Sequence, residues 1–354
     1  MLRTIGLMSG TSLDGVDAAW VETDGVRVGR FGPTLTIPYD AALRADLRLI
    51  LDRAPGMEAD DPALADAVAR LTDVHVRAVR ELGETADLIG FHGQTILHQP
   101  DRRRTWQVGD AARLARETGI RVAYDFRSAD VAAGGQGAPL VPVFHAALAA
   151  TLERPLAILN IGGVANVTWI GTDGALSAFD TGPGNGPLDD WAGRHTGERF
   201  DRDGALARAG AVDPAVLGRL MAAPYFRALP PKSLDRLDFS RTLAESELET
   251  LSPANGAATL AAFTAAAVAA APFPAPPKRW LVCGGGRHNP AIMAALRARL
   301  GVAVEPVESV GWDGDALEAQ CFGFLAARVV AGLPLSFPGT TGVPTPMRGG
   351  RLTG

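Results

Sequence analysis

A glycine-rich turn between two apolar strands occurs twice, and this feature restricts the fold of the chain more than any other. The first turn lies in "GLMSGTSLDGVD" (residues 6–17), between the candidate strands "RTIGLMS" and "VDAAWVET". The second lies in "NIGGVAN" (160–166), between "RPLAILNIGG" and "VANVTWIG". Each pair is followed by a third strand and then by alternating helices and strands. This order predicts a duplicated α/β fold, in which the two turns would face one another across a cleft and form a clamp.

The bulk properties indicate a globular enzyme of two domains. The length of 354 residues exceeds what one hydrophobic core usually serves. Hydrophobic residues make up 47% and charged residues 21%, so there is enough apolar surface to bury. The net charge of −5 argues against a nucleic acid or an anionic membrane as partner. Small-molecule substrates are therefore expected.

Three sequence features favour a cytoplasmic protein. Cys283 and Cys321 lack the spacing of a metal site, and only two cysteines fit a reducing compartment. "MLRTIGLMSG" reads as a first strand and not as a signal peptide. The longest apolar stretch, residues 258–277, is rich in alanine and ends in prolines, so it favours a buried helix over a membrane span.

The remaining pattern places helices around both sets of strands. Helices are expected over 40–53, 61–83, 185–195, 255–271 and 315–332, with shorter ones over 111–119 and 289–301. Residues 127–142 contain three glycines and two prolines without a helical or strand period. They predict a loop and hinge near the domain boundary.

Glycine in such turns allows close approach of a ligand. Without a Cβ, backbone N–H groups reach phosphate oxygens, and hydroxyl groups beside them add donors. A third cluster, "CGGGRHNP", follows a strand and precedes a helix, so it could pack against a nucleotide. It lacks the GxGxxG spacing, and no P-loop sequence occurs in the chain. An ordinary tight hairpin remains the alternative for any one turn taken alone.

Six blocks together resemble the anhydro-N-acetylmuramic acid kinase family. They are "GLMSGTSLDGVD", "GFHGQT", "DFRSADVAAGGQGAPLVP", "LNIGGVANVT", "DTGPGN" and "CGGGRHNP", and they run through nearly the whole chain in order. The resemblance implies the sugar kinase, heat-shock and actin superfamily, whose two ribonuclease-H-like (actin-like ATPase) domains close over ATP. We therefore expect two mixed five-stranded sheets, in domains 1–127 and 128–354, with the C-terminal segment packing back on the first domain.

The resemblance also implies a reaction. The family takes 1,6-anhydro-N-acetylmuramic acid, ATP and water and forms N-acetylmuramic acid 6-phosphate and ADP, in peptidoglycan recycling and amino-sugar catabolism. Such a phosphotransferase needs a base for the water, and Asp180 in "FDTGPGN" is our candidate. On the local sequence alone, Asp180 could equally cap the helix that begins near Asn185.

The family match assigns the glycine clusters to ATP. Phosphate contacts are expected at Gly10, Thr11, Ser12, Leu13, Asp14, Gly15, Val16, Asp17, Gly162, Gly163 and Asn166. Adenosine contacts are expected at Gly284, Gly285, Gly286 and Asn289. Many relatives in the superfamily have an Asp at the end of the first strand, where this chain has Met8. Mg²⁺ would therefore rely on Asp14, Asp17 or waters.

Further residues are candidates for the sugar. Arg127 could grip the lactyl carboxylate through two parallel hydrogen bonds, or form a surface ion pair with Asp125 or Asp130. The other expected contacts are His92, Gln94, Gly182, Asn185 and Glu318. His92 could equally be a structural histidine, and Glu318 a solvated helix residue. The basic run Arg102–Arg104 favours a solvated loop.

Two rival functions stay open at this point. One is a kinase of a different sugar on the same fold. The other is an actin-like ATP-binding regulatory protein without sugar turnover. The sequence also leaves a homodimer open.

Overall fold

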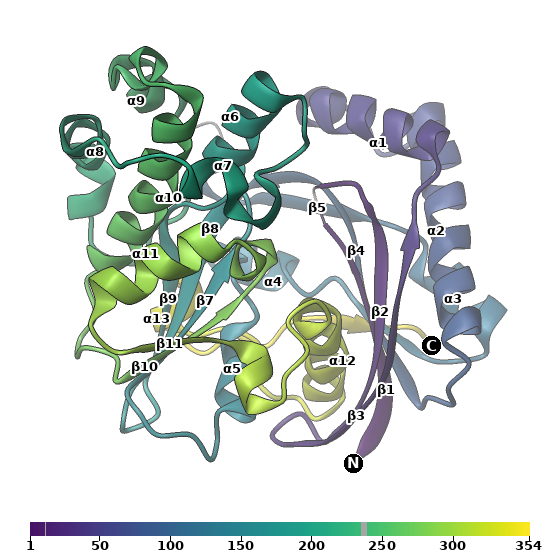
Figure 1. Cartoon of the computed structure of the whole chain (residues 1–354). Coiled ribbons are helices and arrows are strands. Elements are labelled where there is room, and N and C mark those ends of the chain that lie inside the picture. Colours follow the sequence, from purple (N-terminus) through teal and green to yellow (C-terminus); the bar gives the residue numbers. More distant parts are fainter. Residues whose placement is uncertain (11, 235–238) are drawn as a thin grey trace. The chain divides into compact units, whose positions relative to one another are not determined.

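The computed structural model describes residues 1–10, 12–234 and 239–354, and the chain forms two compact units (Figure 1). Unit 1 consists of Met1–Ala150 and Ala316–Gly354, and unit 2 of Thr151–Asp315. The expected boundary near residue 127 thus falls inside unit 1. The physical reason is that residues 128–150 bond to the C-terminal segment, as when Gln136 N donates to Thr341 O (2.7 Å).

The sheet of unit 1 has seven strands instead of the five expected. Its order is β12-β6-β4-β1-β2-β3, and β5 pairs with β4. Strands β1, β2 and β3 form an antiparallel meander, while β4 and β6 run parallel to β1 and to each other. The additional strands are β5, which folds back on β4, and β12, from the end of the chain. The bounds are β1 Leu2–Ser9, β2 Gly15–Thr23, β3 Val28–Pro38, β4 Leu88–Gln99, β5 Arg104–Val108, β6 Val122–Tyr124 and β12 Arg351–Leu352.

The sheet of unit 2 has the five strands expected, in the order β11-β10-β7-β8-β9. Strands β7, β8 and β9 form an antiparallel meander, and β10 and β11 continue from β7 in parallel. Written from the other edge, the order is β9-β8-β7-β10-β11, and it corresponds strand by strand to β3-β2-β1-β4-β6 in unit 1. The duplication and the ribonuclease-H-like topology are therefore confirmed. The bounds are β7 Leu156–Ile161, β8 Val164–Ile170, β9 Leu176–Pro183, β10 Arg279–Cys283 and β11 Ala303–Pro306.

Helices flank both sheets. Unit 1 contains α1 Ala41–Arg53, α2 Pro62–Leu82, α3 Ala111–Thr118, α4 Ser128–Ala132, α5 Pro142–Leu148, α12 Leu317–Val330 and α13 Pro338–Thr341. Unit 2 contains α6 Gly186–Thr196, α7 Ala205–Arg208, α8 Pro214–Met221, α9 Ser240–Glu245, α10 Pro253–Ala269 and α11 Pro290–Leu300. The 3-10 helices are η1 Ala54–Gly56, η2 Pro100–Arg102, η3 Arg202–Gly204, η4 Pro224–Arg227, η5 Leu248–Thr250, η6 Gly285–His288 and η7 Val307–Val310.

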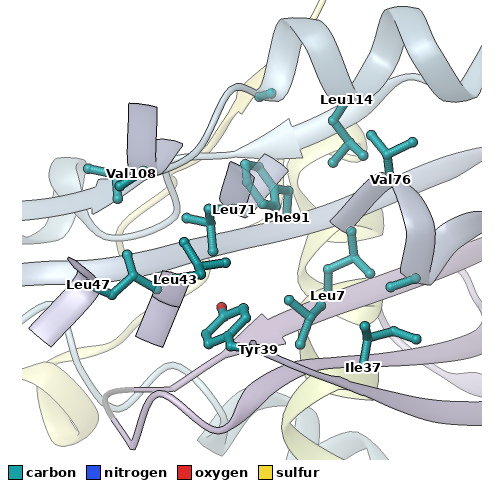
Figure 2. Packing of buried hydrophobic residues seen from close by; sticks show 14 of the residues in the cluster. Leu7, Ile37, Tyr39, Leu43, Leu47, Leu71, Val76, Phe91, Val108 and Leu114 are labelled. Atoms are coloured by element: carbon teal, nitrogen blue, oxygen red, sulfur yellow. The ribbon is translucent and has the colours of Figure 1, made fainter. Parts of the chain in front are cut away.

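The main core of unit 1 lies between its sheet and helices α1, α2 and α3 (Figure 2). Leu7 on β1 and Ile37 on β3 meet Leu43, Leu71 and the other helix residues there, and all are buried. Helix α2 begins as its sequence predicts, because the Asp61 side chain accepts a hydrogen bond from Ala63 N just before the first turn. Burial of one amphipathic face fixes each helix against the sheet.

Helix α12 packs closely on the sheet of unit 1, through glycines. Gly6 and Gly90 are register partners on β1 and β4. A Cβ on Gly6 would lie 1.7 Å from Ala319 O, and one on Gly90 would lie 1.9 Å from Phe322 O. Any side chain at either position would therefore push the helix off the sheet. The last long helix of the chain is thus part of the first unit.

In unit 2 the alanine-rich helix α10 is buried along almost its whole length. Small side chains allow close packing on every side, as the sequence predicts for a buried helix. Across the described residues, every helix is too short or too polar to cross a membrane.

The expectation of a loop without helix over 127–142 is wrong in one part. Residues 128–132 form α4, and the buried Asp130 carboxylate stabilises the glycine-containing segment after this helix. Asp130 accepts hydrogen bonds from Gly137 N (2.6 Å), Thr341 Oγ1 (2.6 Å) and Ser336 Oγ. The segment is thus held by hydrogen bonds to Asp130, two of them from residues far along the chain, and not by a local helical or strand pattern.

Candidate functional site

The β1–β2 turn of unit 1 exposes only part of the expected phosphate-binding run. Ser12 and Asp14 are exposed and Gly10 is half-buried, while the side chains of Leu13 and Val16 are fully buried in the core. Leu13 adopts a left-handed backbone (φ 57°), and its N–H donates to Gly10 O (3.1 Å). Leu13 and Val16 can therefore offer a ligand nothing but backbone groups. Thr11 lies outside the described residues.

Gly15 serves packing between strands. A Cβ there would lie 2.3 Å from Ile37 O, so the missing side chain allows β2 to approach β3. The sequence suggested that this glycine makes room for phosphate. In the structure its lack of a Cβ serves the sheet.

Gln94 lies beneath the same turn, fully buried. Its Nε2 donates to Gly10 O (3.1 Å), and its Oε1 accepts from the Tyr39 hydroxyl (3.3 Å). Gln94 was expected to contact the sugar through its amide. One end of that amide instead bonds the turn and the other bonds the Tyr39 hydroxyl, which makes Gln94 a positioning residue.

The two carboxylates proposed for Mg²⁺ do not form a cation site by themselves. Asp14 pairs with Arg44 (3.2 Å), and Asp17 accepts from Thr36 Oγ1 (2.6 Å). Among the described residues there is no group of three His, Cys, Asp or Glu side chains suited to a metal. Mg²⁺ prefers several oxygen ligands in an octahedral arrangement, so these two carboxylates do not fit it unaided.

The β7–β8 turn of unit 2 consists of Gly162 and Gly163. The Gly163 carbonyl accepts from Gly184 N (3.0 Å) and Gly186 N (3.2 Å), and the Gly162 carbonyl accepts from Asn185 N (2.7 Å). A Cβ on Gly163 would meet nothing within 4 Å. This turn is thus fixed through its carbonyls and leaves open space at Gly163.

Asp180 lies on β9, directly opposite Asn166 on β8. Its Oδ2 accepts from Leu234 N (2.7 Å). Burial raises the pKa of Asp180 to about 6, and the hydrogen bond from Leu234 opposes that shift. Because the first residue of α6 is Gly186 and its N-cap is Asn185, Asp180 does not cap that helix. A carboxylate with this pKa is suited to accept a proton near neutral pH.

Tyr225 and Lys232, which the sequence did not single out, enclose the backbone of Asp180. The Tyr225 hydroxyl donates to Asp180 O (2.6 Å), and Asp180 N donates to Lys232 O (3.0 Å). The Lys232 ammonium lies 4.4 Å from the centre of the Tyr225 ring, and burial lowers its pKa. No local sequence pattern marks these two residues, because they lie about fifty positions after Asp180 in the chain.

The third glycine cluster divides into two structural roles. A Cβ on Gly284 would lie 2.2 Å from Asn160 Oδ1, and one on Gly286 would lie 2.4 Å from Ile161 Cγ2, so both glycines pack on β7. The buried Arg287 donates to Gly284 O (3.0 Å) and pairs with Glu308 and Asp315. Only Gly285 has open space, since its nearest neighbour would be Asn185 Nδ2 at 3.5 Å.

Gly285 lines a cavity of about 440 Å³ in unit 2. The other lining residues are Asn185, Asp189, Phe200, Asp201, Asp203, His288 and Asn289. The size and the mixed lining suit a drug-sized ligand such as a nucleoside. Asn185, expected at the sugar, therefore lies with the candidates for adenosine. Phe200 in this lining is exposed, which only the structure shows, so no sequence signal indicated this cavity.

The side-chain oxygen of Asn289 is engaged in hydrogen bonds to α11, the helix that follows this residue. Its Oδ1 accepts from Ala291 N (3.0 Å) and Ile292 N (3.3 Å), which caps α11. Gly182 also has a packing role, because a Cβ there would lie 2.7 Å from the Ala267 Cβ on α10. Both residues shape the elements around the site.

Arg127, His92 and Glu318 come together in unit 1. Arg127 donates to His92 Nε2 from Nε (3.2 Å) and to Gly137 O from Nη1 (2.7 Å). Burial lowers the pKa of Arg127, and the negative charge of Glu318 opposes the shift. Asp125 and Asp130 are engaged elsewhere, Asp125 with Arg351, so the expected alternative ion pair does not form.

His92 is neutral in this arrangement. Burial, and then the charge of Arg127, lower its pKa well below the usual value. Because Nε2 accepts from Arg127, the ring proton belongs on Nδ1. Within the described part of the chain, this buried Nδ1 has no hydrogen-bond partner. A buried donor without a partner is costly, which makes His92 a candidate for a ligand contact.

The fold and these site elements together indicate the class of protein to which the chain belongs. A duplicated ribonuclease-H-like fold, with a glycine turn in each unit, a cavity suited to a nucleoside and a carboxylate with a raised pKa, is the architecture of an ATP-dependent sugar kinase. A family model described as anhydro-N-acetylmuramic acid kinase matches residues 2–353. The chain belongs to the anhydro-N-acetylmuramic acid kinase family and is a phosphotransferase that acts on a sugar hydroxyl.

Relatives of the same name agree over the full length. The protein of Acidiphilium cryptum is 65% identical, over 99% of this chain and 98% of its own. Those of Gluconobacter oxydans and Rhodospirillum rubrum are 57% and 56% identical, over 99% and 98% of this chain and 99% and 92% of their own. A solved structure, component A of (R)-2-hydroxyglutaryl-CoA dehydratase from Acidaminococcus fermentans, gives a TM-score of 0.49 at 10% identity, over 94% of this chain and 100% of that one. The fold assignment therefore rests on the strand order of each unit.

Proposed function

We propose that the chain converts 1,6-anhydro-N-acetylmuramic acid, ATP and water into N-acetylmuramic acid 6-phosphate and ADP, in peptidoglycan recycling and amino-sugar catabolism. Family membership supports the substrate. The observation that carries the mechanism is the Asp180 carboxylate, which burial holds at a pKa of about 6. At neutral pH it is ionised and still basic enough to take a proton.

Two bond changes are coupled in this reaction. Asp180 removes a proton from water as the water oxygen attacks the anomeric carbon, and the bond from that carbon to the 6-oxygen breaks. The freed 6-oxygen takes the γ-phosphoryl group of ATP, and ADP leaves. Because that oxygen attacks phosphorus, a second carboxylate acting as an acid is not required, unlike in ordinary glycosidases.

The phosphates are assigned to the open positions of the two turns. Gly10 and Gly163 each have room for a ligand beside the backbone, since a Cβ on Gly10 would meet only Ser12 Oγ, at 3.6 Å. Backbone N–H groups at such turns bind phosphate oxygens. Mg²⁺ would arrive with the nucleotide, because Asp14 and Asp17 are not a ready-made site.

The adenosine is assigned to the cavity of unit 2 and the sugar to the cluster in unit 1. Gly285 provides the open backbone of the cavity, with Asn289 behind it. Arg127 keeps guanidinium N–H groups beyond the three that bond His92 and Gly137, so it can bind the lactyl carboxylate. His92 Nδ1 would donate to a sugar oxygen, and the nearby Glu318 carboxylate can accept from a sugar hydroxyl.

Isotope labelling combined with an Asp180→Asn variant tests this function. In H₂¹⁸O, the product should carry one ¹⁸O at the anomeric carbon, and Asp180→Asn should lower kcat by about 10²- to 10⁴-fold while ATP still binds. Asp173→Asn is the matched control, because Asp173 lies in the turn before β9 and only caps the local backbone. Unlabelled product, or sugar-dependent ADP release by Asp180→Asn at the normal rate, would overturn the mechanism.

The same assay separates the rival functions. A kinase of another sugar phosphorylates free N-acetylmuramic acid or a hexose without incorporating solvent oxygen. A regulatory ATP-binding protein binds nucleotide and turns over no sugar. We also propose a cytoplasmic location, which two buried cysteines that form no disulfide support. A homodimer is proposed from the family alone, and light scattering of the purified chain tests it.

A further inference from the structure

The basic run Arg102–Arg104 belongs to the β4–β5 hairpin of unit 1, where two of its three members line a cavity of about 430 Å³. Arg103 and Arg104 are lining residues and Arg102 is not. All three side chains are exposed. A solvated loop explains the exposure but not the cavity that Arg103 and Arg104 line.

Arg103 has an uncommon backbone for its residue type. Its φ of 54° and ψ of 37° place it in the left-handed region, and its N–H donates to Pro100 O (2.8 Å). Residues other than glycine in such conformations often lie at binding sites. In the described part of the chain, neither Arg103 nor Arg104 has a side-chain hydrogen bond or ion pair, so both guanidinium groups remain available.

The rest of the lining is apolar on one side and polar on the other. Met57, Leu97 and Val131 are buried and form an apolar base, beside the half-buried ring of Trp106. Ser128 adds a hydroxyl group. This combination of an apolar surface, an aromatic ring and a few donors is typical of a small-molecule site.

We propose that this cavity binds an anionic amino sugar. The two guanidinium groups would bind a phosphate or carboxylate through charge-assisted hydrogen bonds, which such planar forks form in pairs. The Trp106 ring would pack on the apolar face of the sugar ring. Glu58, also in the lining, would accept hydrogen bonds from sugar hydroxyls. A volume of about 430 Å³ has room for one such molecule.

The cavity differs from the sites assigned to the reaction. Its lining contains none of Arg127, His92, Glu318 and Asp180. The choice of an amino sugar rests on the proposed function, because the substrate and product there are both anionic amino sugars. The choice of an anion rests only on Arg103 and Arg104.

Calorimetric titration of the whole chain tests the proposal with three probes. N-acetylglucosamine 6-phosphate supplies a phosphate, N-acetylmuramic acid a carboxylate, and N-acetylglucosamine neither. At least one anionic sugar should bind at least tenfold more tightly than the neutral sugar. The anionic probe whose affinity falls when Arg103 and Arg104 are replaced identifies the group that the cavity prefers.

Variants of the lining residues test whether the anionic sugar binds in this cavity. Arg103→Gly with Arg104→Ala should weaken the anionic sugar at least tenfold, and glycine suits the left-handed backbone at position 103. Arg102→Ala is the matched control, because it removes the same charge from the same run outside the cavity. An unchanged affinity in the double variant, or an equal loss in Arg102→Ala, would overturn the proposal.

Binding is measured without turnover. Failure of the chain to open the anhydro sugar would contradict the proposed reaction and leave this result standing. Anionic sugars that bind no better than the neutral one would contradict only the cavity.

Discussion

The two glycine turns have the same place in the strand order of their units, but they are held in different ways. In unit 1, the turn is anchored by a side chain, since Leu13 is buried in the core and Gln94 bonds Gly10 O from below. In unit 2, Gly162 and Gly163 of the turn accept backbone N–H groups from residues 184–186, and the Asn185 side chain donates to the adjacent Ile161 O (3.4 Å).

This difference shows that the strand order determines where a glycine turn occurs but does not determine which contacts hold it in place. The turn of unit 1 depends on hydrophobic burial and on one amide. The turn of unit 2 depends on the segment that links β9, which carries Asp180, to α6. A disturbance of that segment would therefore reach the glycine turn and the proposed base together, whereas in unit 1 the turn can be disturbed by itself.

Leu13→Ala should give the largest change in stability. It removes a fully buried side chain from the turn of unit 1, and a Leu→Ala change in a core costs about 2–5 kcal/mol. Urea unfolding measures the loss. Leu49→Ala is the matched control, because Leu49 in the same unit is 59% exposed. Equal stability of the two variants would show that side-chain burial does not anchor this turn.

Asp180→Asn should stabilise the protein at neutral pH while it removes activity. The folded pKa of Asp180, about 6, lies above the ordinary value of 3.8, so the folded state holds its proton more tightly than the unfolded state does. Stability from this group is thus present below about pH 4, is lost as pH rises to about 6, and stays lost above. The shift corresponds to a penalty of about 2–3 kcal/mol at pH 8, which a neutral amide avoids.

Urea unfolding at pH 5 and pH 8 measures this effect. The gain of Asp180→Asn over the unchanged chain should be larger at pH 8 than at pH 5. Asp201→Asn is the control, since Asp201 is a buried carboxylate of the same unit that accepts from Leu206 N and Ala207 N. It should lose stability, because an amide keeps only one acceptor oxygen and one of these two backbone N–H groups loses its partner. A loss in both variants would contradict the burial penalty at Asp180.

The fold could largely be predicted from the sequence because its signals are local. Strands β1, β2 and β3 and their counterparts in unit 2 follow from apolar runs that end at glycine turns. Asp61 and Pro62 mark the start of α2, as expected. The extra strands β5 and β12 could not be predicted, since β12 has two residues and depends on pairing with β6 far away in the chain.

The candidate site could be predicted from the sequence only where the functional residue itself lies in a recognisable local pattern. The position of Asp180 on β9, which continues to Pro183, follows from an apolar strand running into glycines. The pKa that suits it to its role comes from burial, and the residues that enclose it come from positions 225–234. Gln94 was assigned to the sugar because amides bind hydroxyls, but burial beneath the turn determines its contacts.

The pH dependence of turnover sharpens the contrast between the units. As a base, Asp180 must be ionised, so kcat/KM should rise about tenfold from pH 5 to pH 7, with its midpoint at the pKa of about 6, and level off above. Burial lowers the pKa of His92 in unit 1 well below its usual value, so His92 favours its neutral form. Initial rates in buffers of constant ionic strength measure the profile. A midpoint that persists in Asp180→Asn would assign the titration to another group.

Gln94→Met should weaken the turn of unit 1 at nearly constant volume. The change leaves Gly10 O and the Tyr39 hydroxyl without their partners, at a cost of about 1 kcal/mol or slightly more. The KM for ATP should rise several-fold with little change in kcat, because the turn is positioned less well. Gln107→Met is the control, since its amide bonds only threonine hydroxyls on the β4–β5 hairpin. Equal KM values for both variants would remove Gln94 from phosphate binding.

Gly163→Ala and Gly10→Ala should have the smallest effect on stability and compare the two turns directly. A Cβ would meet nothing within 4 Å at Gly163 and only Ser12 Oγ, at 3.6 Å, at Gly10. Neither glycine has a positive φ, so the free energy of unfolding should change by about 0.5 kcal/mol or less. If phosphate oxygens lie at these positions, the methyl groups raise the KM for ATP about tenfold. A rise for one variant alone would assign the phosphates to a single turn.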